Sequence, residues 1–405
     1  MFLNYGAVNL STTELFLTFM KIVHLIDYFQ PSIGYQETFL ARHQQKSGHD
    51  VLVVTSDRYL NFPGYDTFYS RLLGKRFVGA GIRTESGIKT IRLTSWEIPG
   101  SPVIFLKDLE KTIADFAPDL VLCHGIYSLT AYRIAGIRSK ASFRVIFDSH
   151  AASFNTDFNS SWSKKAYHYL FLNKMAPKII NHADKIFVIG EDEQNFLCQD
   201  LHLTKSKVMI IRLGVDTELF KPMIYSGRQV RKALKLGINE LVIIYTGKIT
   251  RNKDVHILVE ALRQINDKIT LLLIGDGQEK YLTEIKKPLR SMKVIHLSFL
   301  SNEQLPKYYS AADLAVWPGD STIAILEAMS CGLPVILPEW YGTAYLDKSG
   351  GVVRFRRKDV RELANRIRQL SNIEKRKFMG VQARQFIQKN LSWDIISGQV
   401  LQLLE

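Results

Sequence analysis

The chain alternates short apolar runs with longer segments of helical period, and this alternation restricts the possible folds more than any other feature. The first series opens at Lys21–Ile26, passes through a turn that contains Gly34 and a helix-length segment at 35–46, and returns to an apolar run at 51–55. Strand-length runs that are joined by helical segments are typical of parallel β-α-β units. We therefore expect an α/β protein whose parallel sheets are covered by helices.

A second series of the same kind begins near the middle of the chain. It opens at 241–245, continues with a helix-length segment at 254–265 and returns to an apolar run at 269–274. The other runs of strand length lie at 120–123, 145–147, 185–189, 294–297, 314–317 and 335–337. A chain of 405 residues is long enough for two or three domains. We expect two Rossmann-like, doubly wound domains.

The best candidate for a linker is the polar stretch at 225–231, together with the segment that leads into it. We accordingly divide the chain into an N-terminal extension (1–19), a first domain (20–215), a linker (216–231), a second domain (232–390) and a final helix (391–405). Ligands bind at the carboxyl ends of the strands in open parallel sheets. If the two domains face each other, these ends border a shared cleft, and we expect the active site there.

The charge balance points to anionic partners. The chain has 53 Lys and Arg residues against 39 Asp and Glu residues, a formal net charge of +14. Such an excess suits nucleic acid, phosphorylated ligands or an acidic membrane surface. We do not expect nucleic acid, because no recognition motif accompanies the charge. No apolar run is long enough to span a bilayer, and three widely separated cysteines suggest reduced thiols. We expect a cytoplasmic protein.

Two glycine turns in the second domain could bind phosphate. Gly247 and Lys248 directly follow the run at 241–245, and Lys253 precedes the next helix. A strand end, a glycine turn, two cations and a helix N-terminus together suit a diphosphate, although lysines on a loop can also be merely solvated. The next strand ends in a second turn with Gly275 and Gly277. Neither turn is a complete dinucleotide or P-loop motif.

Glu327 is an acidic residue within an otherwise apolar helical segment. A buried carboxylate needs hydrogen-bond donors, and the two hydroxyls of a ribose would supply them. A partner within its own helix is the alternative. We find no D-x-D triplet and no carboxylate that stands out as a nucleophile.

The order of these motifs resembles the family 4 retaining glycosyltransferases of the GT-B fold, also called group 1 glycosyl transferases. The matching elements are G-K-x-x-x-x-K at 247–253, I-G-x-G at 274–277 and E-A-M-x-C-G-x-P-V-I at 327–336. The resemblance implies two Rossmann-like domains that face each other across a cleft, with a C-terminal helix that crosses back onto the first domain. It also implies a retaining, hexosyltransferase-type enzyme that moves a sugar from a nucleotide-diphosphate sugar to a glycan or lipid-linked acceptor in cell-surface polysaccharide or glycolipid biosynthesis.

The resemblance assigns roles to single residues of the second domain. Lys248 and Lys253 would neutralise the donor diphosphate, and Glu327 would hold the ribose hydroxyls as the second acid of the family's E-x₇-E element. The first acid of that element falls at Gly319, so its usual contact with a sugar hydroxyl is missing.

Two nearby features could replace that missing acid. One is the neighbouring carboxylate of Asp320. The other is the set of backbone N–H groups of Ser321, Thr322 and Ile323, at the start of the helix that contains Glu327.

In the first domain, the resemblance places Gly34 at the loop that approaches the donor phosphates, since a residue without Cβ permits a close backbone approach. His150 corresponds to a histidine near the transferred sugar, and His124, at the end of the run at 120–123, is a second candidate for the cleft. Each histidine could also be a hydrogen-bonded structural residue.

The implied chemistry is a front-face transfer in which the leaving diphosphate accepts the proton of the acceptor. The enzyme would mainly stabilise the charge that develops on this leaving group. Cationic side chains and helix N-termini would serve in place of a metal ion, so that neither a metal nor another cofactor is required.

Two basic and aromatic stretches in the first domain are candidates for the acceptor side. One is 58–77, which begins with Arg58 and Tyr59, and the other is 162–178. Such surfaces suit an anionic membrane interface, which would make the protein peripheral on the inner face of the membrane. A cleft-edge loop and an ordinary surface helix are the alternative interpretation.

Two other functions stay open at this level. A GT-B subunit that binds a partner or a nucleotide without catalysis would explain Gly319. A sugar-nucleotide epimerase on the same fold would isomerise its substrate without any acceptor.

Overall fold

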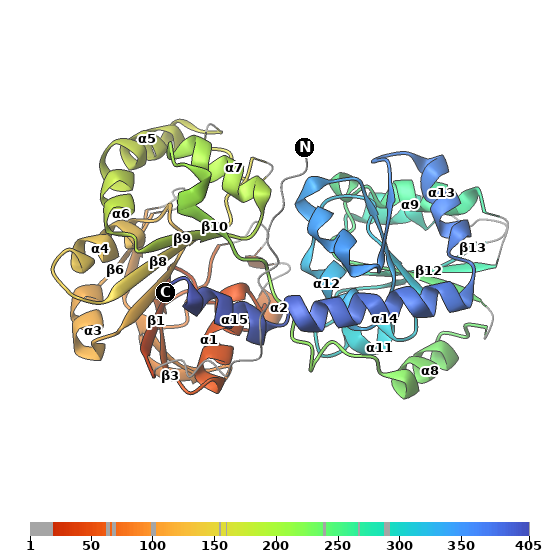
Figure 1. The fold of residues 1–405 in the computed structure, drawn as a ribbon, viewed down its shortest axis with the longest axis horizontal. Coiled ribbons are helices and arrows are strands. Elements are labelled where there is room, and N and C mark those ends of the chain that lie inside the picture. Colours follow the sequence, from red (N-terminus) through yellow and green to blue (C-terminus); the bar gives the residue numbers. More distant parts are fainter. Residues whose placement is uncertain are drawn as a thin grey trace, which may run out of the picture.

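The structure is a computed structural model that describes residues 19–404, except 62–64, 67–69, 99–102, 154, 159, 238–239, 266–267 and 287–291. The extension expected at 1–19 therefore lies, apart from Phe19, outside the described residues. Two α/β domains stand side by side in Figure 1.

The first domain is built on an eight-stranded sheet in the order β10-β9-β8-β7-β1-β2-β4-β3. Its strands are β1 (Lys21–Ile26), β2 (Asp50–Ser56), β3 (Gly81–Glu85), β4 (Ile88–Leu93), β7 (Leu120–His124), β8 (Arg144–Ser149), β9 (Lys185–Val188) and β10 (Val208–Ile210). All neighbours pair in parallel except β3 and β4. A separate antiparallel pair consists of β5 (Ser95–Glu97) and β6 (Ile104–Leu106).

The second domain contains a six-stranded, fully parallel sheet in the order β13-β12-β11-β14-β15-β16. Its strands are β11 (Leu241–Thr246), β12 (Ile269–Ile274), β13 (Met292–Leu297), β14 (Leu314–Val316), β15 (Val335–Pro338) and β16 (Val352–Phe355). Strand β12, which lies between β13 and β11, is buried at every position, as expected for a mainly apolar strand covered by helices on both faces.

The helices lie against these sheets and connect their strands. They are α1 (Gln36–Lys46), α2 (Ser70–Leu73), α3 (Leu109–Phe116), α4 (Leu129–Arg138), α5 (Trp162–Leu170), α6 (Ala176–His182), α7 (Glu191–Asp200), α8 (Ile224–Ala233), α9 (Val255–Arg263), α10 (Glu279–Ile285), α11 (Leu305–Tyr309), α12 (Ile323–Ser330), α13 (Val360–Gln369), α14 (Ile373–Asn390) and α15 (Trp393–Gln402). Within the described residues, no helix has both the length and the hydrophobicity that are needed to cross a membrane.

The last helix returns to the first domain, as the GT-B architecture implies. In Figure 1, α15 lies beside α1 while α14 runs along the second domain. The ring of Trp393 stacks on Phe39, with centroids 5.1 Å apart, and His43 Nδ1 lies 2.7 Å from Asp394 Oδ1. A Cβ on Gly214 would lie 2.6 Å from the Trp393 ring, so the chain between the domains can pass this helix only with glycine there.

Part of the segment expected as a linker is a helix. Residues 224–233 form α8, which packs on α11 of the second domain. The contact is close because Gly227 has no side chain: a Cβ there would lie 2.4 Å from the carbonyl oxygen of Ser310. The polar composition of this stretch reflects the exposed face of a surface helix.

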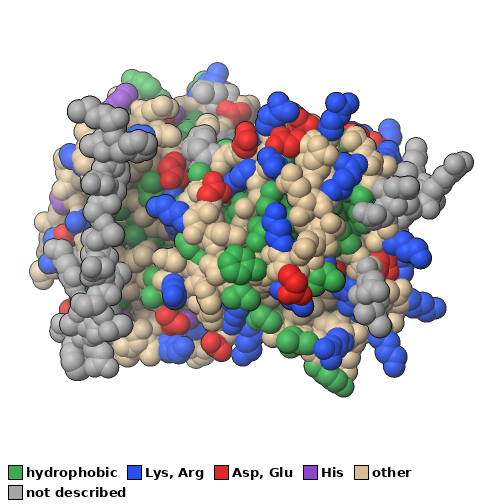
Figure 2. Space-filling view, turned by 45° about the vertical axis from the view of Figure 1, so that its right-hand side comes forward, with side chains coloured by type: hydrophobic (Ala, Val, Ile, Leu, Met, Phe, Trp, Pro, Cys, Tyr) green, Lys and Arg blue, Asp and Glu red, His purple; other side chains and the backbone are tan. Residues whose placement is uncertain are grey.

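The positive charge is distributed widely. Figure 2 shows Lys and Arg side chains spread across the visible face of the molecule, without a single continuous stripe. On this face, the overall charge therefore does not by itself mark one anion-binding site.

Candidate active site

A cavity of about 690 Å³ lies between the two domains. The first domain contributes residues that follow β1, β7 and β8, and the second domain contributes Asn302 and residues of α12. Sheets of parallel strands offer their carboxyl ends to ligands. The cavity is therefore where the fold predicts the active site.

Gly34 lies in the wall of this cavity, in the loop between β1 and α1. Its φ of +76° is a conformation that glycine adopts without strain. A Cβ there would lie 3.4 Å from the side chain of Asn302, across the domain boundary. Glycine thus keeps the loop close to the second domain, as its predicted role near the donor requires.

His124 lies within a chain of hydrogen bonds that connects three neighbouring strands. His24 Nδ1 lies 3.0 Å from His124 Nε2, and His124 Nδ1 lies 2.6 Å from Asp148 Oδ2. At the other end, His24 Nε2 lies 2.8 Å from Gln44 Oε1. The backbone N–H of Gly125 also donates to Asp148, over 2.8 Å.

These contacts assign the protons. The oxygen of Gln44 can only accept, so His24 carries its proton on Nε2 and accepts at Nδ1. His124 then donates from both ring nitrogens, as an imidazolium paired with the Asp148 carboxylate. Burial and the His124 charge lower the pKa of His24 to about 3. Burial disfavours the charged forms of both His124 and Asp148. The attraction between them outweighs this effect, so that Asp148 raises the pKa of His124 and His124 lowers the pKa of Asp148.

His150 lies beside this pair and opens into the cleft. Its Nε2 is 4.0 Å from Asp148 Oδ2, and its side chain is 45% exposed. Burial in the cleft lowers the pKa of His150, although the negative charge of Asp148 raises it in part. The ring lines both the main cavity and an adjoining one of about 250 Å³.

The smaller cavity brings the start of α12 to His150. Its wall contains Ser321, Thr322 and Ile323, and the side chain of Thr322 does not cap the helix. The first N–H groups of α12 are thus available to an anion or a hydroxyl. The structure thus brings His150 and the start of α12, both named from the sequence, together in the wall of one cavity.

Glu327 lies one turn further along α12, in the wall of the main cavity. Only 6% of the residue is exposed. Tyr309 donates to Glu327 Oε2 over 3.3 Å. Burial raises the pKa of Glu327 to about 7, although this hydrogen bond opposes the shift. A ribose diol would supply further donors to this carboxylate.

The glycine turns of the second domain pack against each other. A Cβ on Gly275 would lie 2.0 Å from the carbonyl oxygen of Gly247, and one on Gly277 would lie 2.2 Å from that of Ile249. Close backbone packing thus requires both glycines. The turn holds Lys248 and Lys253 at the carboxyl edge of the sheet, where donor binding by these residues is a prediction.

Asp320 belongs to a cluster of charges around Lys253. Its Oδ1 lies 2.7 Å from Arg357 Nη2, and its Oδ2 lies 3.9 Å from Lys253 Nζ. The sequence interpretation overlooked Arg357, which comes from the loop after β16; its only signal was the basic run in which it lies. Asp320 thus faces two cations, and its binding of a sugar hydroxyl stays a prediction.

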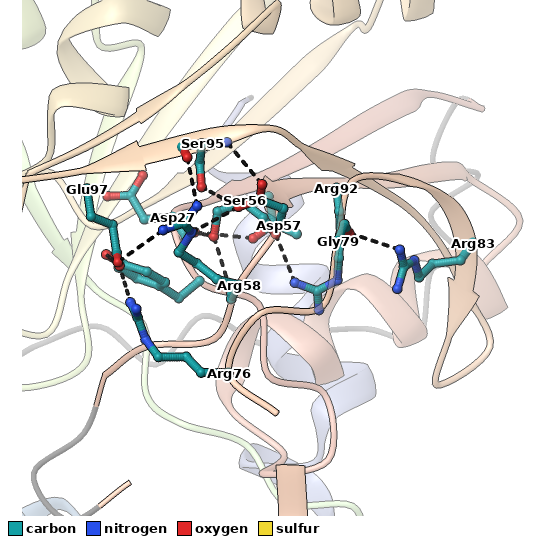
Figure 3. Close-up of polar contacts among 12 residues, drawn as sticks. Asp27, Ser56, Asp57, Arg58, Arg76, Gly79, Arg83, Arg92, Ser95 and Glu97 are labelled. Atoms are coloured by element: carbon teal, nitrogen blue, oxygen red, sulfur yellow. Dashed lines mark hydrogen bonds and ion pairs between the residues drawn. The ribbon is translucent and has the colours of Figure 1, made fainter. Parts of the chain in front are cut away.

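Arg58 and Tyr59 contribute to the internal structure of the first domain. Figure 3 shows Arg58 and Arg76 both directed at Glu97. Arg58 also binds Asp57 over 2.9 Å, and Arg92 lies over the Tyr59 ring at 5.1 Å. At this loop the cavity is lined by Leu60. The structure therefore gives both predicted acceptor-side residues a packing role.

The cavity wall contains carboxyl groups that the sequence interpretation overlooked. Asp27 directly follows β1 and accepts a hydrogen bond from Thr130. Burial raises the pKa of Asp27 to about 7, and that of Glu37, in the first turn of α1, also to about 7. The position of Asp27 just after a predicted strand was a usable signal. Among the described residues, no group of His, Cys, Asp or Glu side chains is arranged to hold a metal ion.

Comparisons with known proteins agree with this geometry. A family model described as Glycosyltransferase Family 4 matches residues 38–219, and one described as Glycosyl transferases group 1 matches residues 240–372. The chain is 25% identical to the sulfoquinovosyl transferase SQD2 of Arabidopsis thaliana, over 88% of this chain and 67% of that protein. It is 22% identical to TuaC of Bacillus subtilis, a putative teichuronic acid biosynthesis glycosyltransferase, over 81% and 83% of the two chains.

Solved structures show the same fold. The chain aligns with HepE of Anabaena in complex with UDP at a TM-score of 0.69 and 19% identity, over 95% of this chain and 99% of the other. It aligns with sucrose-phosphate synthase of Thermosynechococcus elongatus at a TM-score of 0.67 and 21% identity, over 95% and 98%. With its two facing domains and returning C-terminal helix, the chain belongs to the group 1, family 4 glycosyltransferases of the GT-B fold.

Proposed function

We propose that this glycosyltransferase moves a hexose from a nucleotide-diphosphate sugar to a glycan or lipid-linked acceptor with retention of configuration. The observation that carries the proposal is the meeting of His150 with the start of α12 and Glu327 across the domain boundary. These groups suit three parts of one donor: the transferred sugar, the phosphates and the ribose. UDP is the first nucleotide to test, because the similar protein HepE was solved with UDP.

The second domain would hold the donor. Lys248 and Lys253 would neutralise the diphosphate, while the N-terminal N–H groups of α12 bind anionic or hydroxyl oxygens. Glu327 would accept from the ribose hydroxyls. Because each of these groups is positioned before the donor binds, little reorganisation would accompany the build-up of negative charge on the leaving diphosphate.

The first domain would complete the site around the reacting sugar. Gly34 allows the β1–α1 loop to approach the phosphates, and the ring of His150, 4.0 Å from the Asp148 carboxylate, would lie near the transferred sugar. In the front-face path, the acceptor hydroxyl forms its bond to the anomeric carbon as the bond to the diphosphate breaks. The hydroxyl proton passes to a phosphate oxygen of the leaving group.

We also propose that α5 docks on an anionic membrane surface that presents the acceptor. Trp162 and Tyr169 on this helix are 83% and 72% exposed, and Leu170 is exposed as well. Lys164, Lys165 and Lys174 on the same segment are exposed. Amphipathic rings with neighbouring lysines suit the boundary between headgroups and acyl chains.

The test is a screen of nucleotide sugars for thermal stabilisation, followed by turnover with lipid-linked and free glycans. A donor that binds to the native state alone raises its stability with concentration, and Glu327→Ala should reduce this effect. Anomeric configuration of the product by NMR decides between retention and inversion. Binding without turnover would favour a non-catalytic subunit, which Gly319 motivates, and isomerisation of the donor without acceptor would favour an epimerase.

A further inference from the structure

Three buried polar side chains line the first-domain wall of the main cavity. Gln30 is 2% exposed, and Gln36 and Glu37 are each 6% exposed. Each has one buried atom without a hydrogen-bond partner among the described residues: Gln30 Nε2, Gln36 Oε1 and Glu37 Oε1. We call these three residues the α1 cluster.

Such atoms are costly to the free protein. Leaving a buried donor or acceptor unpaired costs about 1 to 3 kcal/mol, and most buried polar groups in folded proteins are paired. Here three unpaired atoms occur together, in the wall of the cavity that contains Gly34, His150 and Glu327. Their concentration in this wall points to a ligand that pairs them.

The unpaired atoms define the chemistry of this ligand. Gln30 Nε2 donates and Gln36 Oε1 accepts, while Glu37 Oε1 accepts when its carboxyl group is ionised and can donate when that group is protonated. A phosphate oxygen only accepts, so it could not pair with Gln36 Oε1 or with an ionised Glu37. Sugar hydroxyls both donate and accept, so they can pair with all three atoms.

One member of the α1 cluster is held in place before binding. Gln36 Nε2 donates to Asp148 Oδ2 over 3.4 Å, which fixes the amide next to the His124–Asp148 pair. Its Oε1 is the atom that has no partner. Binding at this oxygen would therefore require little ordering of the side chain.

The location distinguishes the two sugars of the reaction. Apart from Gly34 and His150, the proposed donor groups belong to the second domain, and the start of α12 shares the smaller cavity with His150. The α1 cluster lies in the first domain, on the same wall as Asp27 and Tyr28. We propose that Gln30, Gln36 and Glu37 bind hydroxyls of the acceptor's sugar ring, an inference that rests on the proposed function.

The experiment uses the full chain and methyl glycosides of glucose, galactose, mannose and N-acetylglucosamine as probes. Each is titrated by ligand-observed NMR in the presence and in the absence of the nucleoside diphosphate that binds best among UDP, GDP and ADP. The variants are Gln36→Leu and Glu37→Gln. Gln45→Leu, an exposed position on the same helix, is the matched control.

We expect at least one glycoside to bind the wild-type protein and Gln45→Leu equally. Gln36→Leu should weaken it about tenfold, the equivalent of one hydrogen bond, without affecting nucleotide affinity. The same variant removes the unpaired Oε1 together with the 3.4 Å bond from Nε2 to Asp148, so these two effects should largely cancel and the unfolding temperature should change little. If Gln36 had only a structural role, the Gln36→Leu variant would instead be clearly less stable than the wild-type protein.

Other outcomes would overturn the inference. It is wrong if no glycoside binds, or if the variants bind glycosides as the wild type does. It is also wrong if the variants lose affinity for an intact nucleotide sugar but not for the glycosides, because the α1 cluster would then bind the transferred sugar. If the proposed function is wrong, no nucleoside diphosphate will bind. The glycoside titrations without nucleotide then still test whether the α1 cluster binds sugar hydroxyls.

Discussion

Gly319 packs directly on the backbone of Lys253: a Cβ at this position would lie 2.6 Å from the carbonyl oxygen of Lys253. Position 319 is where the family places the first acid of its E-x₇-E element. The loop before α12 and the loop that holds Lys253 are in contact, and any side chain at 319 would push them apart. This packing leaves no room for the acid.

Gly319→Glu should consequently destabilise the protein and should not strengthen donor binding. Inserting a side chain into this contact should cost roughly 1 to 3 kcal/mol of unfolding free energy. Denaturant unfolding and nucleotide titration measure both effects. Gly398→Ala is the control, because a Cβ there meets no atom within 4 Å. A stable Gly319→Glu variant with improved binding would show that the loops separate readily.

Glu327→Gln should change the pH dependence of stability. Burial raises the pKa of Glu327 from 4.5 to about 7, so the native state binds this proton more tightly than the unfolded chain does. Its contribution to stability is present below pH 4.5 and is lost as pH rises to about 7, a change on the order of 3 kcal/mol. The variant should not show this loss. Its stability relative to the wild type should therefore be greater at pH 8 than at pH 5. The exposed Glu260→Gln on α9 should leave the profile unchanged.

Asp148→Asn should lower the pKa of His124. In the wild type, Asp148 raises this pKa against the opposing effect of burial, so the interaction stabilises the native state below pH 6.5 and is lost as pH rises through the higher folded value. The variant leaves a buried imidazolium without its counter-charge and should lose roughly 3 to 5 kcal/mol of unfolding free energy below pH 6.5. NMR titration of the histidine ring protons measures the shift directly. An unshifted His124 would contradict the assigned imidazolium, and the exposed Asp50→Asn provides the control.

Lys253→Gln should weaken the binding of a nucleoside diphosphate about tenfold, because one charge-assisted hydrogen bond is lost. Binding of the corresponding nucleoside should be unchanged. Calorimetric titration of both ligands separates the phosphate contribution from that of the base and ribose. Lys232→Gln, an exposed site on α8, should bind both as the wild type does. Equal losses for nucleoside and diphosphate would place Lys253 away from the phosphates.

Replacing both Trp162 and Tyr169 by Ala should reduce binding to vesicles that contain phosphatidylglycerol by tenfold or more, since the two exposed rings would no longer insert at the interface. Co-sedimentation measures this binding, and added salt should weaken that of the wild type by screening the nearby lysines. Phe378→Ala removes a ring that is 66% exposed on α14 and should have no effect. Unaltered binding of the double variant would rule out docking through α5.

The sequence predicted those parts of the fold that depend on local patterns. The strands at 21–26 and 269–274 have the predicted bounds, because mainly apolar runs of this length indicate burial on both faces of a sheet. The strands β3, β4, β10 and β16 and the separate pair β5–β6 were not predicted. Each lies at a sheet edge or next to one and has half-exposed or exposed positions, which weakens the apolar signal.

Some residues of the candidate site could also be found from the sequence, while others required the structure. Gly34 and His150 were identified through the resemblance to the family, and Glu327 also stood out as an acid in an apolar helical segment; all three line the cavity. Arg58 could not be judged from its neighbours in the chain. Its partner Glu97 is 39 residues away, and only the folded chain shows that this charge is already paired.

The sequence by itself thus determined two series of parallel β-α-β units, the edges of the sheets where ligands bind and the family. The tertiary structure alone decided which side chains meet there. The link between His24 and His124 spans 100 residues and exists because β1 and β7 are neighbours in register. The unpaired atoms of the α1 cluster are equally invisible in the sequence, because hydrogen bonding depends on distances that the order of strands and the contact between domains create.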